Sequence, residues 1–382
     1  MPTESLPGQA KPATTAVFSV NAHHPVASRC ILRLALGTAL SMGFSQIVTW
    51  PLSFIAPVFT MFLLVLPLPI PTLKSGLKLV LVILLPLVLA ALTLLPFLEH
   101  LRPVGVLLVA LALFYCFYFT SCGGAPVVGT FMTVGLTLVV TIGSVSIEML
   151  LVVAQGLILG AIFGQMFVWV AHTLLPDLKA ELGVPSATAQ SNVSVPPKPE
   201  LGEARRKAFR AFLITFPMTF FFLLSGASTS WTPVMIKVAS MGQQASIDSS
   251  REMGRSLLES TLWGGVGAII AWQVLSIWPS LLMYALLIGL AGLVFGLRIF
   301  QGSGMHPKSS MWSYAFLTMI IVLAPAVLDS QNGSAAGTAF YTRLLLFMVI
   351  AVYGSVAVAV FDTFWPSVTE QKGRKPDSDS CG

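Results

Sequence analysis

The chain has 382 residues, of which 55% are hydrophobic and 9% charged, and its formal net charge is +6. A soluble domain carries charge on about a quarter of its residues because its surface faces water, so this composition excludes a water-soluble fold. The positive charge does not indicate a nucleic-acid partner, because lysine and arginine stand between apolar runs, as in the cytoplasmic loops of membrane proteins. We therefore expect an all-α polytopic protein of the lipid bilayer.

Residues 1–28 are polar and lack the apolar core of a secretory signal peptide, so we expect them to form a cytoplasmic tail. After them, charge-free intervals predict membrane spans, since about 20 apolar residues in a helix cross the hydrocarbon layer. In chain order, the intervals are 34–73 (two helices broken near 49–53), 79–98 (one), 103–147 (two broken at 121–126) and 149–176 (one). The first membrane half, 29–176, thus holds six predicted spans.

Residues 177–204 are rich in proline, serine and charge, a composition that predicts a cytoplasmic linker without a core of its own. The second membrane half, 205–366, follows, and a polar cytoplasmic tail, 367–382, ends the chain. Five spans of this half are clear: 211–230, 260–297 (two helices), 309–328 and 344–361. A sixth and weaker one is expected at 232–246, which gives twelve spans in all.

Landmarks recur in the two halves at a nearly constant offset. Pro57 and Pro233 are 176 residues apart, and Arg33 and Arg210 are 177 apart. Three further pairs follow the same spacing: Lys74 and Arg251, Lys78 and Arg255, and Pro103 and Pro279. The spacing indicates an internal duplication. Since six is an even number, the two units are expected to be parallel repeats, with both termini on the cytoplasmic side.

The weak span at 232–246 is the most informative segment for function. An ionisable group in mid-membrane costs at least about 2.5–3.5 kcal/mol, so it usually faces a cavity or a partner. One interpretation is that a proline loosens this helix and that its polar groups line a path on which a lysine attracts an anion. That set is Pro233, Lys237, Ser240, Gln243 and Gln244. The alternative is a short helix whose lysine reaches out to the membrane interface.

The helix that follows Pro57 is the counterpart of the weak span, and it is wholly apolar. This contrast predicts that the polar groups of the membrane interior lie in the second half only.

Glycines at four-residue spacing predict close helix packing inside the bundle, with dimerisation as the alternative, so a homo-oligomer is left open. They are Gly156, Gly160 and Gly164 in one run and Gly292 and Gly296 in another.

Two carboxylates are candidates for proton coupling, Glu259 and Asp329. Glu259 lies four residues after Arg255, the spacing at which side chains stack on one helix face, so an ion pair with Arg255 is the alternative. Asp329 and Arg343 stand near the two ends of one expected outer loop, where ordinary surface charges are the alternative.

The sequence has no P-loop, HExxH or GxSxG motif and no histidine, cysteine and aspartate grouping with metal spacing. We therefore expect neither an enzyme nor a bound cofactor or metal.

The segments "RLALGTAL" (33–40) and "WPLSFIAPVFT" (50–60), followed by a basic pair that opens the third helix, resemble the fusaric acid resistance and aromatic acid exporter superfamily. The resemblance covers both membrane halves and is closest to a compact branch of unassigned function. It implies a bacterial inner-membrane efflux component for small aromatic or other organic acids, driven by the proton gradient, beside a periplasmic adaptor of the membrane-fusion type. A non-transporting membrane subunit that docks an envelope partner is the alternative function.

Overall fold

The computed structural model describes residues 25–66, 72–176, 201–225, 231–247, 253–301, 304–331 and 336–365. These residues form twelve α-helices and one short β-hairpin. The helices of the first half are α1 (Pro25–Val48), α2 (Ile55–Val65), α3 (Leu73–His100), α4 (Arg102–Ser121), α5 (Pro126–Gly143) and α6 (Ile147–Leu174). Those of the second half are α7 (Leu201–Leu224), α8 (Thr232–Ile247), α9 (Met253–Ile277), α10 (Leu281–Ile299), α11 (Ser309–Gln331) and α12 (Ala336–Phe364). The hairpin pairs β1 (Phe300–Gln301) with β2 (Gly304–Met305) between α10 and α11.

Ten of the helices in the described ranges are long and apolar enough to cross a membrane, so the protein is an all-helical, multi-pass membrane protein. The two that fall short are α2, with 11 residues, and α8, with 16. They are the second helix of each half. Most of the predicted linker, 177–200, and the tails at 1–24 and 366–382 lie outside the described residues.

The breaks between helices fall where the sequence predicts them. Between α1 and α2 the backbone of Thr49 and Leu52 adopts positive φ angles of 47° and 55°, which no helix tolerates, around a proline at 51. Gly123 turns the chain between α4 and α5 with φ at 93°, a conformation that glycine adopts without steric cost. The last helix, however, begins at Ala336 rather than near 344, because Arg343 is taken up by an ion pair inside the bundle.

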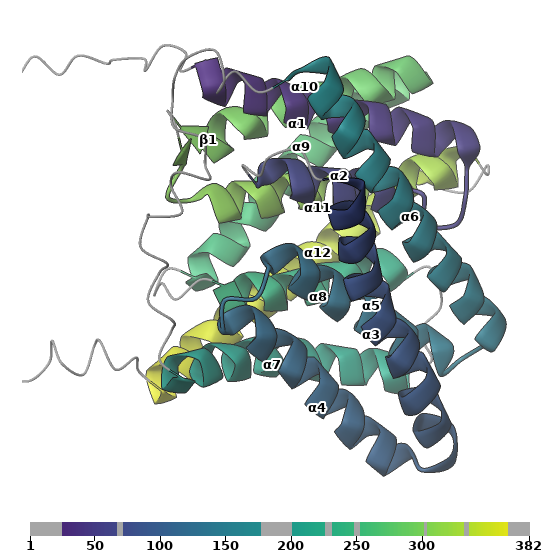
Figure 1. Cartoon of the computed structure of the whole chain (residues 1–382), viewed down its shortest axis with the longest axis vertical. Helices are drawn as coiled ribbons and strands as arrows, with labels where there is room; N and C mark the ends of the chain where they lie inside the picture. Colours follow the sequence, from purple (N-terminus) through teal and green to yellow (C-terminus); the bar gives the residue numbers. More distant parts are fainter. Residues whose placement is uncertain are drawn as a thin grey trace, which may run out of the picture.

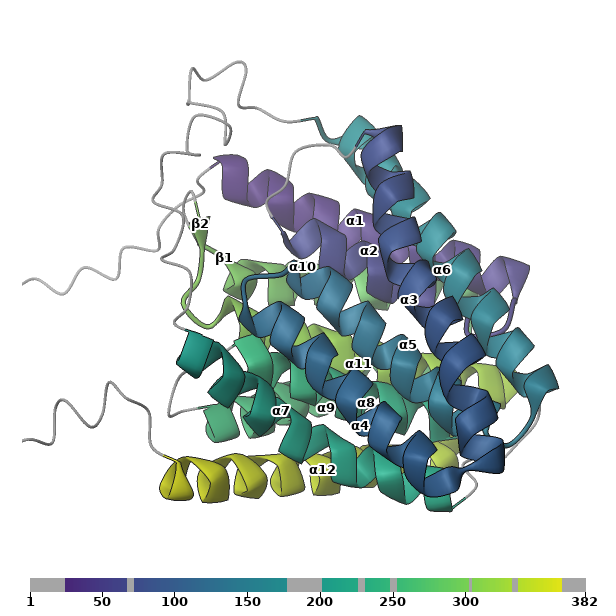
Figure 2. The ribbon, with the colours of Figure 1, turned by 60° about the horizontal axis from the view of Figure 1, so that its bottom comes forward.

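The helices form an inner group of four and an outer group of eight. Nearly every residue of α2 and α8 is buried, and so is 83% of the most apolar window of α5 and 89% of that of α11, against 19–56% for the other eight helices. Figures 1 and 2 show α8 and α11 inside the bundle, with α1, α3, α4, α7 and α12 around them. The inner four are the second and fifth helices of each half.

The outer helices present apolar side chains to the surroundings of the bundle. Leu92 of α3, Leu107 of α4 and Leu282 of α10 are each 70% exposed or more. In water such a surface would be costly, whereas hydrocarbon chains solvate it without penalty. The outward-facing leucines therefore explain why the chain needs so few charges.

Glycines let neighbouring backbones approach closely inside the bundle, as predicted. A Cβ atom added to Gly164 of α6 would lie 2.9 Å from the carbonyl oxygen of Ala56 in α2. A Cβ atom on Gly292 of α10 would lie 2.7 Å from the Cα atom of Ala35 in α1. Both glycine runs thus serve helix packing within one chain.

Among the outer helices, the two halves pack against each other along two seams. In one, α1 of the first half packs along α10 of the second, and in the other α4 packs along α7. In both views the start of α1, the end of α12 and the β-hairpin lie at one end of the bundle, which we call the terminal end (Figures 1 and 2). The other end is called the opposite end below.

Candidate functional site

The α8 helix carries the predicted polar residues through the middle of the inner group. Pro233 is its second residue, a position where proline is tolerated because the missing N–H has no helical partner anyway. The expectation that Pro233 loosens the interior of this helix is therefore wrong. The helix is continuous to Ile247, and its polar side chains are held by tertiary contacts rather than exposed by a break.

Lys237 is 2% exposed and points into the protein. Its Nζ atom donates a hydrogen bond of 2.8 Å to the Oγ1 atom of Thr318 on α11, and that hydroxyl donates in turn to the carbonyl oxygen of Tyr314. Within the described ranges Lys237 has no ion pair. The alternative in which Lys237 reaches the membrane interface is thus wrong, because the inner position of α8 leaves its side chain no route outward.

Gln243, two turns after Lys237, is also fully buried and joins α8 to α5. Its Nε2 atom donates to the carbonyl oxygen of Gly129 at 3.0 Å and to the hydroxyl of Thr133. Ser246 donates to the carbonyl oxygen of Gln243 at 2.8 Å. We call Lys237, Ser240, Gln243, Thr133 and Thr318 the central polar cluster.

Ser240 lies between these two contacts, and its hydroxyl donates to the carbonyl oxygen of Lys237 at 2.8 Å. It also lines a cavity of about 10 Å³ together with Thr130, Phe62 and Phe131. That volume is about the minimum for one water molecule. Among the residues that the structure describes, this cavity beside the central polar cluster is therefore too small for an organic ligand.

Gln244 faces a different neighbour from the rest of the predicted set. Its Nε2 atom donates to the hydroxyl of Ser256 on α9 at 3.1 Å. Its side-chain Oε1 atom is buried and has no hydrogen-bond partner among the residues that the structure describes. The structure therefore brings Lys237, Ser240 and Gln243 together with partners on α5 and α11, and it turns Gln244 toward α9.

Threonines of α5 and α11 belong to the candidate site but do not stand out in the sequence. Thr130, Thr133, Thr137 and Thr141 recur every three or four residues along α5 and are all buried. Such spacing places them on one helix face, a signal that was present in the sequence. Because these threonines belong to the first half, the expectation that interior polar groups lie in the second half only is wrong.

The two candidate proton carriers each form an ion pair away from the central polar cluster. Glu259 accepts from Arg255 at 2.6 Å, which confirms the predicted pairing along α9. Asp329 pairs with Arg343 at 2.6 Å, and the arginine side chain is only 13% exposed, so these are not ordinary surface charges. Asp329 lies 11 residues beyond Thr318 on α11, about 16 Å along the helix axis.

Arginines at the start of α1 bind the end of α6 at the terminal end of the bundle. Arg29 donates to the carbonyl oxygen of Pro176 at 2.6 Å, and Arg33 donates through Nε to that of Leu175, also at 2.6 Å. The last carbonyl groups of a helix have no helical partner and carry partial negative charge, so guanidinium groups stabilise them.

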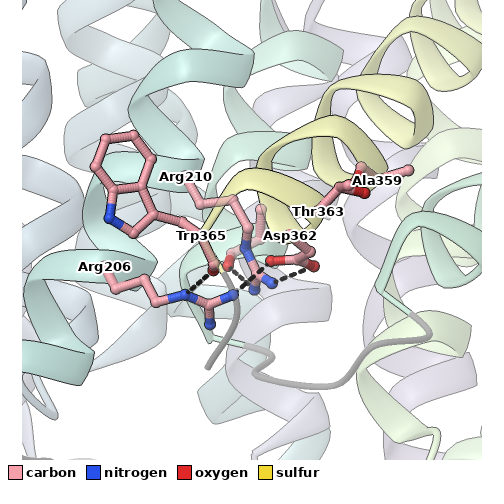
Figure 3. Close-up of polar contacts among 7 residues, drawn as sticks. Arg206, Arg210, Ala359, Asp362, Thr363 and Trp365 are labelled. Atoms are coloured by element: carbon pink, nitrogen blue, oxygen red, sulfur yellow. Dashed lines mark hydrogen bonds and ion pairs between the residues drawn. The ribbon is translucent and has the colours of Figure 1, made fainter. Parts of the chain in front are cut away.

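The second half repeats this arrangement with an added carboxylate (Figure 3). Arg206 of α7 donates to the carbonyl oxygen of Trp365 at 2.8 Å and pairs with Asp362 of α12 at 2.7 Å. Arg210, whose side chain is 2% exposed, pairs with the other oxygen of Asp362 at 3.4 Å and donates to the carbonyl oxygen of Ala245 at 2.9 Å. We call these four arginines and their partners the arginine clasps.

Comparison with known proteins adds one relation. Residues 30–171 match the model of a family described as "Protein of unknown function (DUF2955)". The match covers the first membrane half and agrees with a resemblance to a family of unassigned function, but it does not show the fusaric acid resistance superfamily. No curated protein and no solved structure matches the chain.

Proposed function

We propose that the protein is a membrane carrier of small organic anions and that Lys237 is the group that binds the anion. The observation that supports this proposal is the burial of Lys237 among the inner helices with a neutral hydroxyl, that of Thr318, as its hydrogen-bond partner. A buried ammonium group without a counter-charge is costly, so the site favours a bound anion that supplies the missing charge. An intramembrane lysine of this kind is typical of a substrate pathway.

The aromatic neighbours of Ser240, which lies one turn after Lys237, favour an anion with an aromatic or other apolar part. The Phe59 and Phe131 rings lie 4.6 Å apart between α2 and α5, and Phe62 contacts Phe131 and Tyr314 within about 6 Å. Ser240 of the central polar cluster lines one small cavity with two of these rings. An organic acid of the kind implied by the sequence resemblance would place its carboxylate on Lys237 and its apolar part against the phenylalanines. Since that cavity is small, binding requires the inner helices to separate.

The repeat symmetry suggests which parts move. Arg206 and Arg210 follow Arg29 and Arg33 by 177 residues, and both pairs bind the end of the sixth helix of their half. We infer twelve spans in two parallel repeats, with the terminal end facing the cytoplasm of a bacterial inner membrane. In this scheme each half, held together by its arginine clasp, moves as one rigid body. The space between the inner helices then opens alternately to one side of the membrane and to the other. Single cysteines placed before α1 and after α12 test the topology, since both must react with an impermeant maleimide from the same side.

Transport is tested with purified protein in liposomes, by uptake of radiolabelled 4-hydroxybenzoate at pH 7.5 with and without a pH gradient. We expect Lys237→Met to abolish protein-dependent uptake and Lys237→Arg to keep part of it, because only the arginine retains the charge. Lys78→Met, which removes an exposed lysine of α3, is the matched control and should transport normally. Uptake by Lys237→Met at the wild-type rate would remove Lys237 from the mechanism.

The energy source and the partner are further parts of the proposal. We assign proton coupling to Glu259 or Asp329, and a membrane-fusion-type adaptor at the opposite end is the expected partner. If the wild-type protein moves no organic anion under any gradient, the alternative role, a non-transporting subunit that docks an envelope protein, becomes the better explanation. Co-purification from the membrane with an adaptor would then identify that partner.

A further inference from the structure

A second pocket lies at the opposite end of the bundle, away from the central polar cluster. Its volume is about 390 Å³, within the range of sites for small molecules. It is lined by the end of α1, the ends of α9 and α11, and the start of α10, so it lies at the α1–α10 seam between the two halves. Val327 of α11, one of its lining residues, is nine residues beyond Thr318, about 13 Å along the helix.

Within the described part of the chain, two buried polar side chains that line this pocket have no hydrogen-bond partner. Gln46 of α1 is 5% exposed, and neither its Nε2 nor its Oε1 atom has a partner. Tyr284 of α10 is 1% exposed, and its hydroxyl also has none. Buried polar groups are almost always hydrogen-bonded, so two unsatisfied ones on one pocket require an explanation. A ligand that pairs with both supplies it.

The α4–α7 seam, which is the counterpart of the α1–α10 seam, carries no such polar pair, so helix packing at this position does not require these groups. At the offsets seen between the halves, the counterpart of Gln46 is Leu223, and that of Tyr284 is Leu108. Leucine at both counterparts satisfies helix packing without any polar atom. Gln46 and Tyr284 are therefore additions that serve something other than the shared architecture.

The remaining lining defines the chemistry of the ligand. Trp272 offers an aromatic surface, Leu275 and Val327 are apolar, and no charged side chain is among the lining residues that the structure describes. A bare carboxylate would lose its hydration there without gaining a cation, which is unfavourable. A primary amide such as that of Gln46 presents one donor and one acceptor side by side. It is complementary to a neutral group with the same pair, namely a carboxamide or a protonated carboxyl.

We propose that this pocket is a second binding site, specific for uncharged aromatic compounds that carry a carboxamide or a protonated carboxyl group. Gln46 pairs with both atoms of that group, the Tyr284 hydroxyl makes a third hydrogen bond, and Trp272 packs against the ring. The site is independent of Lys237 and of the proposed transport of anions. It lies between the two halves at the α1–α10 seam, so a ligand bound there contacts residues of both halves.

The test is ¹⁹F NMR of 4-fluorobenzamide and 4-fluorobenzoate at pH 7.5 with the protein in lipid nanodiscs, with empty nanodiscs as the measure of lipid partitioning. We expect saturable binding of the benzamide and at least tenfold weaker binding of the benzoate, which is ionised at this pH. Gln46→Leu, which installs the residue type found at the counterpart position 223 of the second half, should weaken benzamide binding at least tenfold. Tyr284→Phe, which removes only the hydroxyl, should weaken it several-fold.

Two further measurements separate binding from folding. Both variants remove unpaired buried polar atoms, so their unfolding temperatures should equal or exceed that of the wild type. Lys237→Met should bind the benzamide normally, since it lies outside this pocket. Equal binding of the amide and the ionised acid, unchanged binding in Gln46→Leu and Tyr284→Phe, or no saturable binding beyond empty nanodiscs would each overturn the proposal.

Discussion

The arginine clasp of the second half makes a quantitative prediction for the change Asp362→Ala. Asp362 is the shared partner of Arg206 and Arg210, and its loss leaves both guanidinium groups without the carboxylate (Figure 3). The two arginines differ in burial, with 15% of the Arg206 side chain exposed against 2% of that of Arg210. The cost of the change therefore comes mainly from Arg210.

Removing one partner of a buried ion pair costs about 3–5 kcal/mol, since a buried charge is left uncompensated. A partly exposed pair such as that of Arg206 adds less than about 1 kcal/mol. The 3.4 Å separation between Arg210 and Asp362, and the bond that Arg210 keeps to Ala245, place the expected loss at the lower end. We expect Asp362→Ala to lower the free energy of unfolding by about 3 kcal/mol.

Equilibrium unfolding in mixed micelles of increasing SDS content, followed by tryptophan fluorescence, measures this loss. Glu259→Ala is the matched control, since it breaks an ion pair of 2.6 Å whose arginine is 73% exposed, and it should cost less than about 1 kcal/mol. The double variant Arg210→Met with Asp362→Ala should recover most of the stability, because the more deeply buried of the two guanidinium charges is then removed as well. An Asp362→Ala variant that loses no more stability than the control, or a double variant less stable than Asp362→Ala alone, would contradict this role of Asp362.

Three more predictions concern the interior. Thr318→Val keeps the shape of the side chain but removes the hydrogen-bond partner of Lys237. In liposomes, the affinity of this variant for 4-hydroxybenzoate should differ from that of the wild type by about tenfold, or about 1.4 kcal/mol, while the protein folds normally. Gln243→Leu leaves the carbonyl of Gly129 and the hydroxyl of Thr133 without their α8 donor, and SDS unfolding should show a loss of about 1–3 kcal/mol. Gly292→Ala forces α1 and α10 apart and should cost about 1–3 kcal/mol in the same assay, whereas Gly202→Ala, where a Cβ meets open space, should not destabilise.

The helices could be predicted because each rests on local composition. The charge-free intervals, the prolines and the glycine at 123 mark where helices begin and end, and the structure follows them closely. Two helices begin earlier than predicted: α7 starts at Leu201 rather than at 211, within the predicted linker, and α12 starts at Ala336 rather than at 344. At the start of α12 the ion pair between Arg343 and Asp329 keeps a charged residue inside the bundle. Two charges that neutralise each other across helices leave no signal in either segment alone.

The candidate site could be predicted only in part. Lys237, Ser240 and Gln243 stand out in an apolar sequence because an amide or ammonium group in a membrane helix is rare. Their partners do not stand out, because a threonine in a membrane helix satisfies its hydroxyl on its own backbone, as Thr133 does at 2.9 Å to Gly129. Whether such a threonine faces lipid or another helix is then decided by packing.

The sequence by itself determined the solvent, the helical class and the order of the segments, since hydrophobic length and charge spacing act within each helix. Only the tertiary structure decided that α2 and α8 lie inside, that Lys237 meets Thr318, which is 81 residues away, and that Gln46 and Tyr284 share one pocket. The physical reason is that a hydroxyl or amide in hydrocarbon gains its energy from whichever partner the packing of helices brings near. That choice joins residues far apart in the chain.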